Sequence, residues 1–289
     1  MRFFFLIIAR NNNGSVKQLF NIKAGGQLEI MQPVLSIRMG ERHCCFSITG
    51  FATQELQQLA YYTTNVVDES FLLELFAAHP ELNGNFYQVL VCYDHPQSTL
   101  VPLKYYNHEK GTLLLKTMFG VNVTAIVFSE AVTEWQLYNI YAVPKEVHGW
   151  MSMKFASGKF WHQYSVSIKN IIAADEDGSL LVDLRKEDFT VLAAANSKLL
   201  IAQTFNYSTP EDVLYYLLKV CQQFGLSQRE VHLGLSGLVD LQSALYKGLH
   251  QYFIHIEFRD AKWTIPISAN NECPAHFFTS LNDLSGCAS

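Results

Sequence analysis

The sequence predicts a mixed α/β fold of two similarly ordered lobes, each a sheet of parallel and antiparallel strands flanked by helices. Residues 178–237 contain three strand-like runs with short polar connectors, a capped helix and a returning strand. The same order of elements occurs earlier in the chain, from Met31 onward. A strand that returns through a helix runs parallel to the strand before that helix. Two such lobes are expected to face each other across a cleft, where ligands usually bind.

The first thirty residues do not follow this pattern. Phe3–Ala9 is apolar, but it is too short to span a bilayer and lacks the small-residue cleavage site of a signal peptide. Two interpretations stay open: an over-extended start with Met31 as the true initiator, or a short membrane-proximal leader. Residues 1–30 are therefore expected to lie outside the fold.

Residues 31–156 are expected to form the first lobe. Three strands joined by short turns open it, and a fourth follows a helix: Val34–Met39, His43–Thr49, Gln57–Thr63 and Phe86–Tyr93. Asp68 is placed to cap that helix and Pro80 to end it. The helix presents an apolar face at helical spacing: Phe71, Leu72, Leu75 and Phe76.

The rest of this lobe is less regular. We expect a polar loop over Asp94–Pro102, a helix near His108–Phe119, and a strand pair over Val121–Ser129 and Glu134–Val143. Pro144 opens a further helix. The lobe boundary is expected within Phe155–Trp161, so that residues 157–289 form the second lobe.

The second lobe repeats the order of the first. Its three opening strands are Leu180–Leu184, Phe189–Ala194 and Lys198–Phe205. The following helix has Thr209 as its cap, Pro210 at its first position and Gly225 as the left-handed residue that ends it. Four more elements follow: the strand Glu230–Leu235, the helix Asp240–Gly248, the strand Tyr252–Phe258 and the helix Pro274–Leu281. Thr264–Ile267 is expected to be a short edge piece.

Two runs allow a closer comparison: VDLRKEDFTVLAAANSKLLIAQTFNYSTPEDVLYYLL and VHLGLSGLVDLQSALYKGLHQYFIHIEF. They resemble an uncharacterised bacterial family, a domain of unknown function with an actin-like ATPase fold. The resemblance covers most of Met31–Phe258, and its most distinctive segment is Leu200–Leu218. It implies two ribonuclease-H-like lobes, as in sugar kinases, actin and heat-shock chaperones. The family carries no assigned activity that could be transferred.

The nucleotide loops of that superfamily are only partly represented. Its first phosphate loop normally carries an Asp and then a Gly, but Leu35–Gly40 contains no carboxylate before Glu41. In the second loop Asp183 stands where an Asp belongs, but Leu184 and Arg185 follow it in place of Gly. A Cβ at that point hinders close approach of phosphate to the backbone. Ser236–Gly237 fits in part the place of the adenosine-side Gly pair.

This pattern predicts weak or absent ATP hydrolysis, because phosphoryl transfer relies on a positioned metal and donors around the phosphates. The first hypothesis is a non-catalytic actin-like scaffold or interaction module with degenerate nucleotide-binding loops. The alternative is a weak nucleotide-binding ATPase or kinase-like enzyme that binds ATP and magnesium through Asp183, Ser236 and Gly237. A third hypothesis, a membrane-associated component, rests only on Phe3–Ala9.

The candidate residues also have structural interpretations. Asp183 can pair with the Arg185–Lys186 turn, and Ser236–Gly237 can simply end a strand.

The six cysteines include no C-x-x-C pair, and no four-ligand set is visible around Cys273. A net charge of −5 with no run of basic residues argues against nucleic-acid binding. We therefore expect a protein partner, no metal, no transmembrane segment and a cytoplasmic location.

Overall fold

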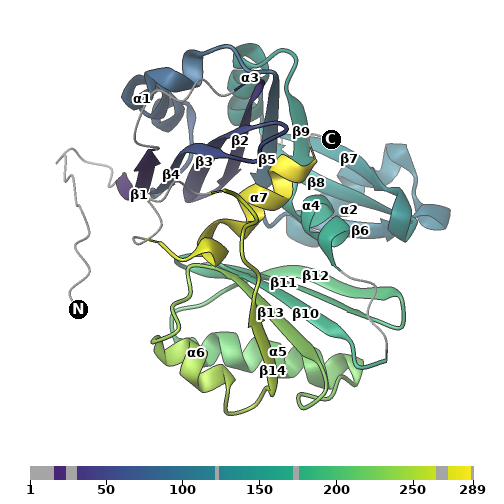
Figure 1. Cartoon of the computed structure of the whole chain (residues 1–289). Helices are drawn as coiled ribbons and strands as arrows, with labels where there is room; N and C mark the ends of the chain where they lie inside the picture. Colours follow the sequence, from purple (N-terminus) through teal and green to yellow (C-terminus); the bar gives the residue numbers. More distant parts are fainter. Residues whose placement is uncertain (1–15, 24–30, 121–123, 172–175, 265–272, 288–289) are drawn as a thin grey trace.

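The computed structural model describes residues 16–23, 31–120, 124–171, 176–264 and 273–287. It has two lobes, each built on its own sheet, and a third small sheet beside the first lobe (Figure 1). None of the helices in these ranges has both the length and the apolar character needed to traverse a lipid bilayer. The expected mixed α/β class with a duplicated lobe is confirmed.

The first lobe is a six-stranded mixed sheet in the order β1-β4-β3-β2-β5-β9. The antiparallel strands β2, β3 and β4 form the predicted meander, while β5 pairs parallel with β2, and β9 pairs parallel with β5. The strands are β1 (Lys17–Lys23), β2 (Pro33–Gly40), β3 (His43–Gly50), β4 (Leu56–Thr63), β5 (Gln88–Asp94) and β9 (Lys159–His162).

Two helices cover one face of this sheet, α1 (Glu69–Ala78) and α3 (Lys145–Lys154). The Asp68 side chain accepts a hydrogen bond from the Phe71 backbone N–H, as expected of the cap. All four residues of the predicted apolar face are buried. The 3-10 turn Pro80–Asn83 ends the segment. Helical spacing was sufficient to identify this face because the helix has a single sheet to cover.

Two boundaries of the first lobe were predicted wrongly. Residues 1–30 were expected outside the fold, but β1 pairs antiparallel with β4 and Ile22 is buried; residues 1–15 and 24–30 lie outside the described ranges. The lobe boundary after residue 156 comes too early, because β9 still adds to the first sheet. Gly158 therefore lies in the connection from α3 to β9, and not in a linker between lobes.

The third sheet has the order β6-β8-β7, and it is antiparallel throughout. Its strands are β6 (Ser98–Pro102), β7 (Ala125–Val132) and β8 (Leu137–Pro144). Helix α2 (Gly111–Phe119) packs on it through Leu115. The pairing of β7 with β8 was predicted, but β6 was not, because Asp94–Pro102 was taken for a loop. β6 has only five residues and ends at Pro102, which conceals the alternation by which a strand is recognised.

The second lobe is a five-stranded sheet in the order β12-β11-β10-β13-β14. Its strands are β10 (Ser179–Leu184), β11 (Asp188–Ala195), β12 (Lys198–Asn206), β13 (His232–Gly237) and β14 (His255–Phe258). Helix α5 (Pro210–Phe224) has Thr209 in a reciprocal capping box with Asp212, and Gly225 ends it with φ of 68°. The predicted helix Asp240–Gly248 is shorter, as α6 (Ala244–Leu249).

The chain crosses between the lobes twice. Helix α4 (Gln163–Asn170) follows β9, and helix α7 (Thr279–Gly286), preceded by the 3-10 turn Ala275–Phe278, lies across the junction of the lobes (Figure 1). Helix α7 contacts β2, β3 and β5 of the first sheet as well as β13 of the second. Residues 157–289 are thus not confined to the second lobe. Thr264 forms one isolated bridge with Glu55, and residues 265–267 lie outside the described ranges.

A buried polar network ties the third sheet to the first crossing. The Ser165 hydroxyl and the His162 backbone N–H both donate to Glu130 Oε2, at 2.7 and 3.1 Å. The Asn139 amide in turn donates to Ser165 Oγ and to His162 Nδ1, each at 3.0 Å. Burial raises the pKa of Glu130 to about 7, because the hydrogen bond from Ser165 only partly offsets the loss of hydration.

Glu130→Gln is expected to flatten the pH dependence of stability. The folded carboxyl holds its proton more strongly than the unfolded one, so wild type loses stability relative to the variant as pH rises from about 4.5 to about 7. The relative loss reaches at most about 3 kcal/mol. Urea unfolding of both proteins at several pH values measures it. Stability curves that stay parallel through this window would contradict it.

Candidate functional site

The structure brings the three sequence-predicted site residues together. β10 and β13 are neighbouring parallel strands, and Asp183 is in register with Ser236, as Leu184 is with Gly237. The Ser236 hydroxyl donates to Asp183 Oδ1 at 3.1 Å. The residues therefore lie at the carboxyl ends of adjoining strands, the edge at which open α/β sheets usually bind ligands.

An arginine of the first lobe occupies the space in front of Asp183. Arg38, near the carboxyl end of β2, places Nη2 at 2.6 Å from Asp183 Oδ2 and at 2.6 Å from Asp94 Oδ2. Arg185 Nη1 lies 3.3 Å from each of the same two oxygens. We call these four residues the central ion cluster. It joins the two lobes and pairs two cations with two carboxylates.

The surrounding residues hold the cluster in one geometry. Arg38 Nη1 donates to the Ser280 hydroxyl of α7, and its Nε donates to Asp94 Oδ2 at 3.0 Å. Arg185 pairs with Asp188 and donates to Thr190 Oγ1 at 2.9 Å. Helix α7 therefore covers the cluster from the junction of the lobes. This packing explains why the four charged side chains are only 3–13% exposed.

The charges of the cluster stabilise one another. Burial alone would raise the pKa of Asp94, but Arg185 and Arg38 hold it well below its ordinary value. Burial alone would lower the pKa of Arg38, but Asp183 and Asp94 raise it above its ordinary range. Each group is therefore stabilised in its charged form by the opposite charges beside it. Removing one member would leave a buried charge without its partner.

Sequence reasoning found only part of this site. It identified Asp183 and offered pairing with the Arg185 turn as an alternative interpretation, and Arg185 does lie within ion-pair distance. It missed Arg38, Asp94 and Ser280. The available signals were an arginine within the apolar strand β2 and a carboxylate at the end of β5. Charged residues at such positions are rarely buried unless they are paired.

The superfamily's ATP and magnesium do not fit at Asp183 in this arrangement. Magnesium needs carboxylate oxygens that are free to complete its coordination shell, whereas Asp183 accepts from Arg38 and Ser236 and lies beside Arg185. Gly237 has a structural role as well. Its φ is 82°, and a Cβ there would lie 2.0 Å from the Leu184 carbonyl oxygen. The close passage of β13 past β10 is sufficient to require glycine.

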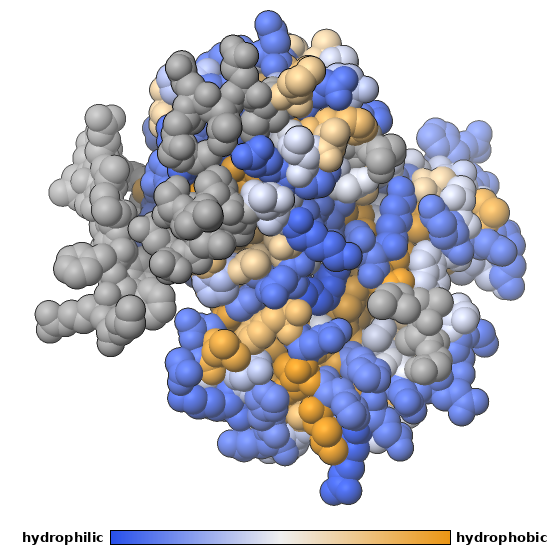
Figure 2. Space-filling view, viewed as in Figure 1, coloured by the Kyte–Doolittle hydropathy of each residue, from blue (hydrophilic) through white to orange (hydrophobic). Residues whose placement is uncertain are grey.

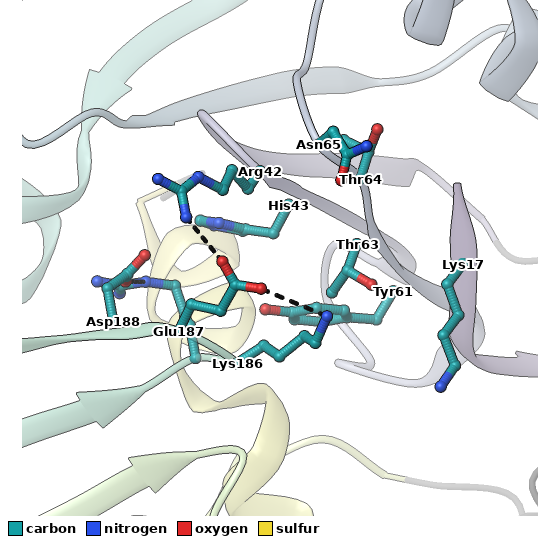
Figure 3. Close-up of a pocket in the computed structure, with 11 residues that line it drawn as sticks. Lys17, Arg42, His43, Tyr61, Thr63, Thr64, Asn65, Lys186, Glu187 and Asp188 are labelled. Carbon is teal, nitrogen blue, oxygen red and sulfur yellow. Dashed lines mark hydrogen bonds and ion pairs between the residues drawn. The ribbon is translucent and has the colours of Figure 1, made fainter. Parts of the chain in front are cut away.

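A polar cavity of about 350 Å³ opens beside the cluster, between the β2–β3 and β10–β11 turns (Figure 3). Arg42 and Lys186 both point toward Glu187, and Arg42 forms a 2.7 Å ion pair with it between the lobes. The buried Tyr61 hydroxyl lines the cavity without a hydrogen-bond partner among the described residues. The cavity is therefore lined by both cations and carboxylates, and Glu187 already pairs with Arg42 and Lys186.

The structure shows where the cysteine and histidine residues considered as zinc ligands lie. Cys44 and Cys45 lie in different hydrophobic clusters on opposite faces of β3. His276 lies 2.7 Å from the Val239 carbonyl oxygen through Nε2, in position to donate to it. Within the described ranges, no group of three histidine, cysteine or acidic side chains is arranged to hold a metal ion.

The family model described as "Protein of unknown function (DUF3822)" matches residues 27–256. A Bacteroides thetaiotaomicron protein with actin-like ATPase fold and unknown function has a TM-score of 0.72 at 21% identity, over 91% of this chain and 100% of that one. The PilM–PilN type IV pilus biogenesis complex gives 0.54 at 10% identity, over 89% and 98%. No curated protein matches. The actin-like ATPase fold expected from the sequence is confirmed.

Proposed function

This chain belongs to the DUF3822 family of proteins of unknown function, and we propose that it is a non-catalytic actin-like module that binds another protein. One observation carries the proposal, the central ion cluster. The cluster occupies the junction of the lobes, where an ATPase of this fold would need a free carboxylate. Arg38 from the first lobe and Arg185 from the second both compensate Asp183.

The energetics of the cluster oppose its conversion into a metal site. Turning Asp183 toward magnesium would remove one of the two carboxylates that compensate Arg38. A buried guanidinium that loses its partner costs about 3–5 kcal/mol. Phosphoryl transfer is stabilised mainly by positioned metal and donor groups. In this protein the carboxylate Asp183 and the cations Arg38 and Arg185 pair with one another across the two lobes. This pairing supports a scaffold role in place of catalysis.

The fold is compatible with a protein partner. PilM–PilN is by its name a protein complex, and it shares this fold at a TM-score of 0.54. We infer by this analogy of fold alone that the present chain also works by binding a protein. A cytoplasmic location is part of the same proposal, since Cys44, Cys45, Cys92, Cys221 and Cys287 form no disulfide within the described ranges, as is usual in a reducing compartment.

The polar cavity supports a second candidate, a weak nucleotide-binding ATPase or kinase-like enzyme using Asp183, Ser236 and Gly237. Both hairpin turns line that cavity, and Arg42 and Lys186 are cations that could meet phosphate. ATP with magnesium would then be its cofactor. This candidate requires the cluster to open, because Asp183 is otherwise engaged.

A thermal-shift measurement separates the two candidates. ATP or ADP with magnesium is expected to leave the melting temperature of the full chain within about 1 °C. A ligand at about a hundred times its Kd would add about 2.7 kcal/mol and raise the melting temperature by several degrees. Such a rise, abolished in the double variant Arg42→Ala with Lys186→Ala, would favour the nucleotide-binding candidate. Magnesium-dependent ATP hydrolysis at ordinary enzymatic rates would do the same.

A further inference from the structure

Two sheet edges line a second cavity, whose lining residues differ from those of the cavity beside the central ion cluster. The cavity has a volume of about 530 Å³, and both β6 and β12 line it. β6 is an outer strand of the third sheet, and β12 is an outer strand of the second-lobe sheet. Among the described residues, β12 pairs only with β11. One row of its backbone donors and acceptors is therefore directed away from its own sheet.

The cavity lining carries no charge. Every residue that lines it is apolar or uncharged, including Leu100 of β6 and the run Leu199–Thr204 of β12. Sheet edges are usually protected from pairing with other chains by charged side chains or proline. The three other edge strands of the two large sheets each carry charge, with Lys17 and Lys23 on β1, Lys159 on β9 and Glu257 on β14. β12 carries no charge beyond Lys198 at its start, so its edge is left open to pairing.

Exposed apolar side chains extend the same surface. Met118 and Phe119 at the end of α2 line the cavity and are 53% and 40% exposed. The face in Figure 2 is mainly hydrophilic, with hydrophobic side chains showing toward the middle of the molecule. Exposed apolar groups beside a cavity are typical of interaction surfaces.

We propose that an extended, uncharged segment of a partner protein adds to β12 as a further strand and lies in the groove between β12 and β6. This inference rests on the proposed function, since it names the surface through which the module binds. β12 is the edge that pairs, because it has nine residues and no proline. β6 has five residues and ends at Pro102, which lacks an N–H to donate.

The groove also defines the chemistry of the bound segment. In an added strand, alternate side chains point to opposite faces, so every second residue meets β6 and the end of α2. Those residues must be uncharged, because a charge buried against this lining would have no partner. The uncharged part of β12, Leu199–Asn206, corresponds to about six to eight partner residues. Main-chain hydrogen bonds supply the affinity, and the apolar positions supply the selectivity.

A displayed library of random peptides about twelve residues long, selected on the full chain, tests the proposal. Enriched peptides are expected to share an uncharged centre with alternating apolar residues. Ala202→Lys on β12 and Thr99→Lys on β6 each place a charge in the groove and are expected to weaken binding at least about tenfold. The matched control Gln223→Lys adds the same charge to the exposed side of α5, outside the groove, and is expected to retain affinity within about twofold.

Amide hydrogen exchange supplies an independent readout of strand pairing. Exchange over Leu199–Asn206 is expected to slow when an enriched peptide binds, whereas exchange over α5 stays unchanged. Peptides that bind all three variants equally, or a library that yields no enrichment, would overturn the proposal that the groove is a binding site. If the wild-type chain self-associates and the two groove variants do not, the groove binds a second copy of this chain. That result would also overturn the proposal that a partner protein binds there. Nucleotide binding would overturn the proposed function without altering any of these readouts.

Discussion

Arg38→Met is expected to lower the free energy of unfolding by about 3–5 kcal/mol. The variant removes a guanidinium that is 3% exposed and leaves Arg185 as the remaining arginine beside both Asp94 and Asp183. Methionine keeps much of the side-chain volume, so the loss reports on charge and hydrogen bonding more than on packing. Urea denaturation followed by circular dichroism measures the difference from wild type.

Arg42→Met is the matched control for this variant. Arg42 also pairs across the two lobes, with Glu187 at 2.7 Å, but both side chains are about half exposed, at 53% and 48%. An exposed ion pair contributes at most about 1 kcal/mol. Equal losses in the two variants would show that burial of the central ion cluster is not what stabilises the junction of the lobes. Recovery of stability in the pair Arg38→Met with Asp183→Leu would further support the charge argument.

Gly237→Ala is expected to cost about 4 kcal/mol or to prevent the second lobe from folding. Two effects act at this residue: its φ of 82° disfavours a side chain, and the added Cβ would lie 2.0 Å from the Leu184 carbonyl oxygen. Backbone atoms of a central strand cannot move aside as a flexible side chain can, so β13 must shift away from β10. Soluble yield and thermal unfolding measure the cost.

Gly225→Ala separates the two effects. Gly225 has a similar φ of 68° at the end of α5, but an added Cβ would meet no atom within 4 Å. Only the backbone preference is lost there, at about 1 kcal/mol. If both variants lose the same stability, the close approach of β13 to β10 is not what requires Gly237. That result would favour a role for Gly237 in contacting a nucleotide.

The elements that sequence reasoning recovered are those whose signals are local. Thr209, Pro210 and Gly225 bracket α5 in the structure as the sequence predicted. Asp68 and its apolar stripe did the same for α1. In each case the hydrogen bonds that start or end the helix involve residues within one or two turns. The pattern of side chains along the chain therefore carries the information.

The elements that were missed have no local signal of comparable strength. β1 is a strand because β4 offers it an edge, and most of its side chains are exposed or half-buried. β6 is short and ends at a proline, and it is defined by its pairing with β8. β9 was assigned to a linker because Gly158 precedes it, although β5 provides its partner. Strand formation depends on a partner that can be far away in sequence.

The sequence by itself determined the class of fold, the duplicated order of elements, the ends of helices α1 and α5, and the meeting of Asp183 with Ser236 and Gly237. Only the tertiary structure decided what Asp183 does. Its carboxylate meets Arg38 from 145 positions away, and Arg38 also binds Asp94 from 56 positions away. Nothing local marks these residues as partners, because burial and pairing of charges arise only when two sheets and α7 pack together. For the same reason, the uncharged edge of β12 can be proposed as a binding surface only once the structure places it beside β6.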